Sequence, residues 1–84
     1  MFPRLTLIFF TKSDCPLCDR VDQLLAIGQR RWPIDVRTVD IRSDPAAYEL
    51  YWDRIPVVVF PDGTSLEAPI RRDQLFRAIR IRCA

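Results

Sequence analysis

Two cysteines three positions apart, Cys15 and Cys18, are the residues of this 84-residue chain whose type and spacing could do chemistry. They close the stretch Thr-Lys-Ser-Asp-Cys-Pro-Leu-Cys, which follows an apolar run and precedes a helical pattern. Residues three apart share one helical turn, so the two thiols can close a small disulfide ring. A Cys-x-x-Cys pair is also half of a typical zinc site. The motif alone therefore predicts either reversible thiol redox chemistry or metal binding.

The rest of the sequence favours redox chemistry over a zinc site. The chain has no histidine, and its only other cysteine is Cys83. A closed four-ligand site would need Cys83 together with a carboxylate or a partner chain. Three cysteines in a reducing compartment also argue against a disulfide scaffold. We expect no metal, and a redox-active pair between a strand and a helix.

The expected place of the pair assigns a different role to each thiol. Cys15 should lie at the helix N-terminus, where free N–H groups and the helix dipole favour the thiolate and lower the pKa of the thiol. Lys12 adds a nearby cation, whereas Asp14 opposes the effect unless it acts as a capping group. Cys18 lies one turn inside the helix and is less exposed. We therefore expect Cys15 to be the nucleophile and Cys18 the resolving thiol.

Hydrophobic patterning predicts seven secondary-structure elements. Short apolar or alternating runs are typical of strands, and apolar residues at helical spacing are typical of helices. Pro16 and Pro45 each suit the first position of a helix, and Ser43 and Asp44 provide an N-cap for the second helix. We expect strands at 5–10, 34–41, 57–60 and 65–67, and helices at 16–31, 45–52 and 71–83.

These elements predict one α/β domain over residues 1–84. The first strand, residues 5–10, is almost continuously apolar and should be central and covered on both faces. Strands joined by long crossovers should run parallel, and the Asp62-Gly63 turn should make a hairpin that adds antiparallel strands. The order β-α-β-α-β-β-α, with a four-stranded mixed sheet flanked by three helices, is that of a thioredoxin fold.

A second functional element is the segment Arg54-Ile55-Pro56, just ahead of the third strand. Proline cannot donate to a sheet ladder. If the Ile55–Pro56 bond is cis, the chain can turn sharply and bring the backbone of Ile55 beside the cysteines, where a substrate could pair as an added strand. An ordinary trans proline at the start of an edge strand is the alternative, and base rates for such bonds favour it.

Composition limits the classes of partner. The net charge is only +2, and the charges are interspersed, so we expect no nucleic-acid partner. The N-terminal apolar stretch is too short for a signal peptide, and no stretch approaches the length of a membrane span. We expect a cytoplasmic monomer that does not associate with membranes.

Two further patterns leave alternatives open. Aromatic residues crowd the second helix and would either pack over the sheet or form a docking surface. Arginines give the last helix a basic face, which is either solvated or a docking site for an acidic partner or weak RNA contact. Cys83 would be a semi-buried or frayed thiol, or would form an intermolecular disulfide.

Four segments of the sequence together resemble a glutaredoxin-like protein of the thioredoxin superfamily. They are the stretch from Phe10 to Cys18, Val39-Asp40-Ile41, Ile55-Pro56-Val57 and the Asp62-Gly63 hairpin. The resemblance implies that Cys15 attacks, that Cys18 resolves and that Pro56 is the family's cis-proline. It also implies that Lys12 meets a glutathione carboxylate and that the backbone of Ile55 pairs with the glutathione cysteine.

Two departures from the family pattern concern the substrate. Leu17 stands where glutaredoxins usually carry an aromatic residue between the cysteines. The Gly-Gly pair and acidic neighbour that receive the γ-glutamyl end of glutathione are replaced by the segment from Leu66 to Asp73. Asp73 or the Arg71-Arg72 pair could substitute for them. The resemblance therefore implies the fold and the thiol chemistry more strongly than the substrate.

The sequence thus predicts a small thiol–disulfide oxidoreductase with a role in cell redox homeostasis. It would reduce disulfides in proteins or small molecules, or glutathione mixed disulfides, through Cys15 and Cys18. No metal or organic cofactor is expected, and electrons would come from glutathione or a thioredoxin-reductase-type protein. One alternative is a non-catalytic interaction module whose cysteine pair switches binding. Another is a metal or iron–sulfur carrier with Cys15 as a ligand in a dimer.

Overall fold

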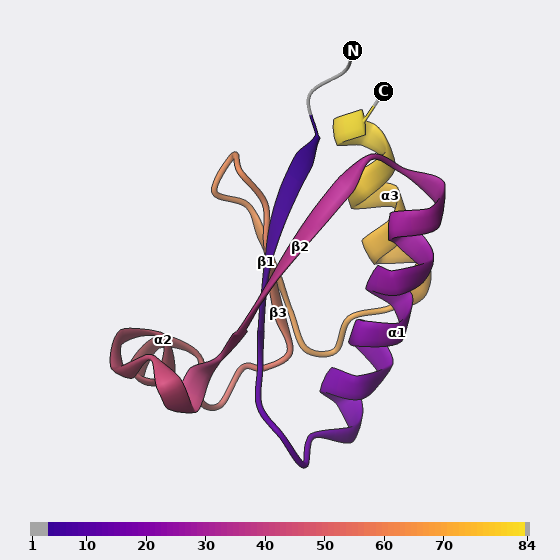
Figure 1. Cartoon of the computed structure of the whole chain (residues 1–84). Coiled ribbons are helices and arrows are strands. Elements are labelled where there is room, and N and C mark those ends of the chain that lie inside the picture. Colours follow the sequence, from indigo (N-terminus) through magenta and orange to yellow (C-terminus); the bar gives the residue numbers. More distant parts are fainter. Residues whose placement is uncertain (1–3, 84) are drawn as a thin grey trace.

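The computed structural model describes residues 4–83 of the chain (Figure 1). Seven of its elements follow the predicted order, and one short 3-10 helix is additional. The boundary at Ile41 was wrong, because this residue begins the 3-10 helix instead of ending the second strand. The Asp40 side chain caps that helix by accepting a hydrogen bond from the Arg42 N–H at 2.9 Å. The elements are β1 (Leu5–Thr11), α1 (Pro16–Arg31), β2 (Ile34–Asp40), η1 (Ile41–Ser43), α2 (Pro45–Tyr51), β3 (Val57–Val59), β4 (Ser65–Glu67) and α3 (Arg72–Cys83).

The four strands form one mixed sheet in the order β2-β1-β3-β4, which confirms the predicted thioredoxin fold. Strand β1 pairs in parallel with β2 and antiparallel with β3, and β3 pairs antiparallel with β4. In the parallel pair, Leu5 is opposite Ile34 and Thr11 is opposite Asp40. The C-terminal ends of β1 and β2 therefore lie side by side at the same end of the sheet.

The two predicted prolines begin their helices. Pro16 is at the first position of α1, and the preceding Cys15 is the N-cap. Pro45 follows the N-cap Asp44, whose carboxylate accepts a hydrogen bond from the Ala47 N–H at 3.2 Å. The fixed φ of proline suits this position, and its missing N–H has no partner to lose there. Local sequence chemistry thus sets where both helices begin.

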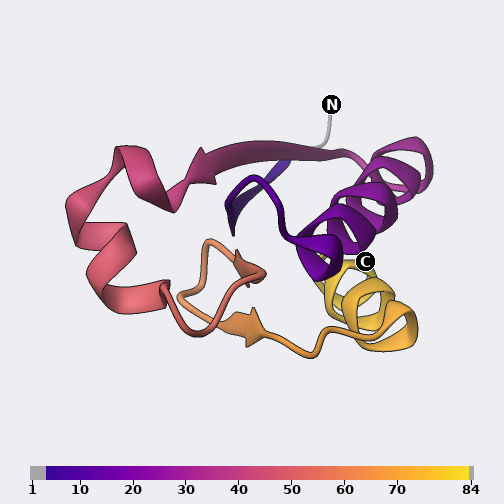
Figure 2. The same ribbon diagram turned by 90° about the horizontal axis from the view of Figure 1, so that it is seen from below.

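One face of the sheet holds the main core. Figures 1 and 2 show α1 and α3 side by side on this face, with α2 apart from them across the strands. Leu7 and Phe9 of β1 are fully buried there. Burying each such side chain contributes roughly 1.5–3 kcal/mol. Other members of this core are Val21, Leu24, Leu25, Ile34, Val58, Phe60, Leu75 and Ile79.

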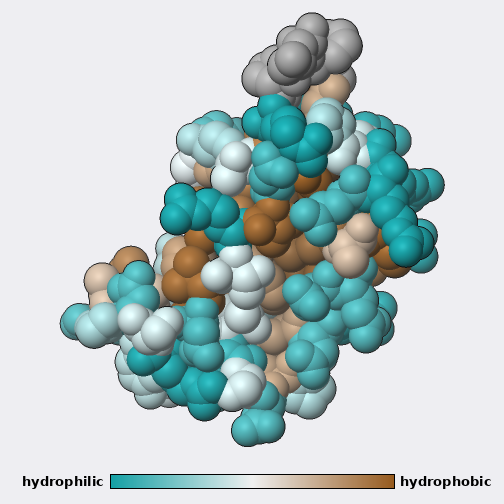
Figure 3. All heavy atoms as spheres, in the orientation of Figure 1, coloured by the Kyte–Doolittle hydropathy of each residue, from teal (hydrophilic) through white to brown (hydrophobic). Residues whose placement is uncertain are grey.

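The opposite face of the sheet is only partly covered. Ile8 and Phe10 of β1 are half-buried, so the prediction that this strand is covered on both faces was only partly right. The Phe10 ring lies 4.6 Å, centroid to centroid, from the Tyr51 ring of α2. Hydrophobic surface is visible over the strands between α2 and α1 (Figure 3). Helix α2 is too short to cover the whole face.

The β3–β4 hairpin is closed by the predicted turn. Gly63 has φ +87°, a left-handed conformation that glycine adopts without steric cost. The Thr64 N–H donates to the Asp62 carboxylate at 2.9 Å, and this bond is the main cause that lowers the pKa of Asp62. Arg82 of α3 reaches the same carboxylate at 3.1 Å and stacks over the Phe60 ring. These contacts fix the end of α3 against the hairpin.

Candidate active site

The cysteine pair lies at the N-terminus of α1, immediately after the chain leaves β1. The sulfurs of Cys15 and Cys18 form a disulfide, with the two Cα atoms 5.2 Å apart. Cys18 is 1% exposed, whereas Cys15 is half-buried. The Cys18 N–H points at the Cys15 Sγ at 3.2 Å. An external disulfide can therefore reach Cys15 more easily than Cys18.

Cys15 is the N-cap of the helix, so its sulfur replaces the side-chain oxygen that usually receives the first N–H groups. A reduced Cys15 in this position meets unpaired donors and the positive end of the helix dipole. Both favour the negatively charged thiolate over the thiol. The local geometry supports the nucleophilic role that the sequence predicted for Cys15.

Asp14 does not cap the helix, which corrects one of the two roles that the sequence allowed for it. Its φ is +58°, in the left-handed region, which aspartate and asparagine tolerate better than most residues. This conformation turns the chain from the loop into Cys15. The exposed carboxylate therefore lies next to the nucleophile, where it opposes thiolate formation.

Arg42 of η1 is a residue beside the site that sequence reasoning missed. Its guanidinium hydrogen-bonds the Ser13 hydroxyl and the Asp40 carboxylate. The Arg42 hydrogen bond lowers the pKa of Asp40, and Asp40 in turn raises the pKa of Arg42, to which Asp14 also contributes. Arg42 thus ties the end of β2 to the loop that carries Cys15.

A sequence signal for Arg42 exists in the strand register. Thr11 is opposite Asp40 in the parallel pair, so residues two positions further along each chain meet at the sheet edge. These residues are Ser13 and Arg42. Finding them requires the exact register of β1 against β2, which hydrophobic patterning alone does not provide.

The Ile55–Pro56 peptide bond is cis, which is what the family resemblance implied and base rates did not. Pro56 is buried and lines a groove of about 460 Å³ together with Leu17 and Val21 of α1. The Ile55 N–H donates to the Tyr51 carbonyl at 3.1 Å. A substrate strand would therefore pair with the Ile55 carbonyl. The role of Ile55 in substrate binding stays a prediction.

The far side of this groove is the loop from β4 to α3, where glutaredoxins carry the Gly-Gly pair. Here the loop contains a second cis bond, Ala68–Pro69, and the charged residue Arg71, and Arg72 follows as the first residue of α3. Arg71 hydrogen-bonds Asp73 at 3.3 Å, which lowers the pKa of that carboxyl. The groove beside the cysteines is thus basic at this end.

Lys12 lies on the exposed loop between β1 and α1, close to Cys15 in the chain. Within residues 4–83 the structure gives no ion pair to its ammonium group. Its predicted role toward a glutathione carboxylate stays a prediction.

Cys83 does not line the groove beside the cysteines, nor do the aromatic residues of α2 and its C-cap Trp52. Cys83 is a free, half-buried thiol packed against the core. Tyr51 packs on the sheet, but Tyr48 and Trp52 are exposed, so packing over the sheet explains only one of the three aromatics.

The described part of the chain offers neither a metal cluster nor a spanning helix. Over residues 4–83, no three side chains of His, Cys, Asp or Glu are grouped so that they could hold a metal ion. Among the helices between these limits, none has the length and apolar character needed to cross a bilayer.

Comparison with known proteins agrees with this geometry. The family model described as "Glutaredoxin-like domain (DUF836)" matches residues 6–80. No match was found among curated proteins. Among solved structures, target protein XcR50 from X. campestris is 28% identical, with a TM-score of 0.76, and the alignment covers 89% of this chain and 96% of that one.

Two further solved structures are thioredoxin-type proteins. A reduced desulfothioredoxin from Desulfovibrio vulgaris Hildenborough is 26% identical, with a TM-score of 0.70 and coverage of 95% of this chain and 82% of that one. A thioredoxin from Halobacterium salinarum is 20% identical, with a TM-score of 0.79 and coverage of 95% and 75%. The latter likeness shows the fold alone. Fold and cysteine pair together indicate thiol redox activity.

Proposed function

Because the chain belongs to the glutaredoxin-like family, we propose that it is a small dithiol thiol–disulfide oxidoreductase that reduces disulfides in proteins or glutathione mixed disulfides. The observation that carries this proposal is the Cys15–Cys18 disulfide at the start of α1, with Cys18 buried and Cys15 partly exposed. This asymmetry suits a nucleophile that meets substrate and a second thiol that meets only the nucleophile.

In the first step, the Cys15 thiolate attacks one sulfur of the substrate disulfide. The substrate S–S bond breaks, its second sulfur leaves as a thiolate and takes a proton, and a mixed disulfide forms between Cys15 and substrate. The helix N-terminus stabilises the attacking thiolate. Arg42 holds the loop that carries Cys15 through its bond to Ser13.

In the second step, Cys18 attacks the sulfur of Cys15. The substrate leaves as its second thiol, and the Cys15–Cys18 disulfide forms, so two electrons have passed from the protein to the substrate. Two thiols must then reduce the protein again. Glutathione or a thioredoxin-reductase-type protein would supply them. No metal or organic cofactor takes part in this cycle.

The groove that contains Leu17 and Pro56 is the proposed substrate site. An extended substrate would cross it and pair with the Ile55 carbonyl, as in strand addition. Lys12, on the exposed loop before Cys15, would attract a substrate carboxylate. We further propose that the protein acts as a monomer in the cytoplasm, where thiols are kept reduced, and contributes to redox homeostasis.

A trapping experiment tests this proposal. Cys18→Ser in a Cys83→Ser background should accumulate mixed disulfides, because the resolving step is lost while attack by Cys15 continues. The matched Cys15→Ser variant in the same background should trap nothing. Non-reducing gels and mass spectrometry identify the trapped species. Equal trapping by both variants, or no trapping together with no turnover of glutathione mixed disulfides, would favour the alternative of a non-catalytic redox switch.

A further inference from the structure

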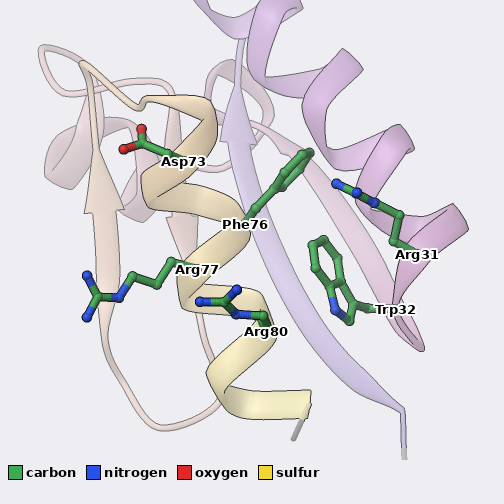
Figure 4. Close-up of a pocket in the computed structure, with 6 residues that line it drawn as sticks. All are labelled: Arg31, Trp32, Asp73, Phe76, Arg77 and Arg80. Atoms are coloured by element: carbon green, nitrogen blue, oxygen red, sulfur yellow. The ribbon is translucent and has the colours of Figure 1, made fainter.

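A second basic groove lies between the C-terminal end of α1 and the outer side of α3. It has a volume of about 530 Å³ and is lined by Arg31, Trp32, Asp73, Phe76, Arg77 and Arg80. Figure 4 shows the two aromatic rings beside the Arg31 guanidinium, with Arg77 and Arg80 extending from α3. Neither Cys15 nor Cys18 lines this groove, and the proposed thiol chemistry does not use it.

The arginines of this groove are free to bind an anion. Within residues 4–83, no carboxylate lies at ion-pair distance from Arg31, Arg77 or Arg80, whereas other arginines form six ion pairs. One of these pairs joins Arg71 to Asp73, the acidic residue of this groove. An arginine guanidinium offers a planar fork of donors that matches a carboxylate. Three unpaired guanidinium groups around one hollow therefore point to a ligand with several negative charges.

Arg31 is held in place by the aromatic residues. Its guanidinium carbon lies 5.5 Å from the Trp32 ring centroid and 5.6 Å from that of Phe76, within the range of cation–π attraction. The two rings pack edge to face at 5.3 Å. The two rings restrain the guanidinium, and within residues 4–83 no carboxylate pairs with its N–H groups. This restraint reduces the conformational freedom that Arg31 would lose on binding.

This groove adjoins the groove beside the cysteines. Asp73 lines both, and the cysteine groove adds Arg20, Arg71 and Arg72. The two grooves thus present six arginines and one aspartate, and Arg71 hydrogen-bonds that aspartate at 3.3 Å. Together these seven residues form a basic track that runs from the end of α1 and across α3 to the cysteine pair. The residues of the track are Arg20, Arg31, Arg71, Arg72, Asp73, Arg77 and Arg80.

We propose that this basic track binds an acidic segment of a disulfide-containing protein substrate while Cys15 attacks its disulfide. The proposal rests on the proposed oxidoreductase function and adds a substrate class to it. An acidic polypeptide fits better than a nucleic acid because one end of the track is a redox disulfide, and a polypeptide can carry both a disulfide and carboxylates.

The dimensions of α1 set where the acidic residues should lie in the substrate. The helix rises about 1.5 Å per residue, so Arg31 is roughly 24 Å from Cys15 along the axis. An extended peptide covers about 3.3 Å per residue. The acidic segment should therefore begin within about seven residues of the substrate cysteine.

Two synthetic peptides test the proposal. Each peptide carries one cysteine in a mixed disulfide with 2-mercaptoethanol. Within about seven residues of this cysteine, one peptide has a run of glutamates and the other has a run of glutamines. We expect kcat/KM to be about tenfold higher for the glutamate peptide at low salt, and the ratio to shrink as salt screens the charges. Equal rates for the two peptides would overturn the inference but leave the proposed function intact.

Matched variants locate the effect. Arg77→Gln/Arg80→Gln should reduce the ratio between the two peptides about threefold or more. Arg30→Gln/Arg37→Gln serves as the control, because these two exposed arginines lie outside the track and form no ion pair within residues 4–83. An equal loss in both double variants would show general charge attraction only and would overturn the proposal.

A binding measurement separates this inference from the proposed function. In a Cys15→Ser/Cys18→Ser/Trp52→Phe variant, Trp32 is the only tryptophan. It lines the second basic groove beside the track arginines Arg31, Arg77 and Arg80, so its fluorescence should change when the glutamate peptide binds. This signal should appear even if neither peptide is reduced, in which case only the oxidoreductase proposal fails. No fluorescence change with the glutamate peptide, or tighter binding of a single-stranded oligonucleotide at the same salt, would overturn the choice of an acidic polypeptide.

Discussion

Replacing Asp14 by asparagine should make Cys15 more reactive at moderate pH. Asp14 is exposed and directly precedes Cys15, so its carboxylate opposes the thiolate. Asparagine tolerates the left-handed φ of +58° at this position and removes only the charge. The substitution therefore tests electrostatics without a large change in backbone preference. It should lower the pKa of the Cys15 thiol.

The size of the effect follows from Coulomb's law. Because Asp14 is exposed, we take an effective dielectric of about 60, which is nearer to the value of water (about 80) than to that near a protein surface (about 20). For an assumed separation of about 7 Å, one charge then changes the thiolate energy by about 0.8 kcal/mol, and Arg42 offsets part of this. The remainder corresponds to about threefold more thiolate below the pKa. A more acidic thiol is a weaker nucleophile, with a Brønsted slope of about 0.4–0.5, so the net rise in rate is about twofold.

Alkylation of Cys15 by iodoacetamide across a range of pH measures this effect. Cys18 is 1% exposed, and Cys83→Ser removes the remaining thiol. Below the thiol pKa the Asp14→Asn rate should be about twice the parent rate, and well above it about 0.6 of the parent rate. Asp22→Asn removes an exposed charge further along α1 and should change little. A pH profile identical to that of the parent, or one displaced in the opposite direction, would refute the electrostatic reasoning.

Arg42→Gln should act with the opposite sign. It removes a cation that interacts with Asp14 and that hydrogen-bonds Ser13 in the loop before Cys15. Alkylation below the thiol pKa should slow by about twofold. Arg42→Lys keeps the charge and should restore part of the rate. If Arg42→Gln and Arg42→Lys slow the reaction equally, the planar geometry of the guanidinium matters more than its charge.

Two further predictions concern stability. A Cβ on Gly28 would lie 3.3 Å from the Ile34 Cδ1 atom. Gly28→Val should therefore lower the free energy of unfolding, measured by urea denaturation, by about 2 kcal/mol, whereas Ala26→Val at an exposed position should change it by less than about 0.5 kcal/mol. Similar losses at both positions would contradict the packing argument. In the folded chain, Arg42 lowers the pKa of Asp40 below its ordinary value of 3.8. The unfolded chain therefore binds a proton at Asp40 more readily than the folded chain does, and the free energy of unfolding should fall as the pH drops below 3.8. Thermal unfolding followed by circular dichroism at stepped pH should show a flatter acid profile for Asp40→Asn, and a profile parallel to that of the parent would contradict this linkage.

Much of the fold was predictable because its signals are local. Proline at the first helical position set the starts of α1 and α2, and turn residues set the hairpin. The boundary at Ile41 failed because an apolar residue at the end of an alternating run looks like strand. Only the side chain of Asp40, which bonds the next turn, ends the strand there.

The uneven cover of the sheet was not predictable from the first strand. Its apolar run is consistent with two buried faces, but α2 has only seven residues and reaches one part of the second face. Coverage depends on the length and position of a different element. The hydrophobic pattern of a strand indicates which of its residues favour burial. It does not indicate whether another helix or strand is placed to cover them.

The sequence by itself determined the pair Cys15 and Cys18, its place at a helix start and therefore the class of chemistry. These depend on spacing along one short segment. Only the tertiary structure decided what surrounds the pair: Arg42 from the end of β2, the cis bond before Pro56, and a basic track to which α1, the loop before α3, and α3 itself contribute. The physical reason is that strand register and helix packing join residues far apart in the chain, and no local pattern records which of them will meet.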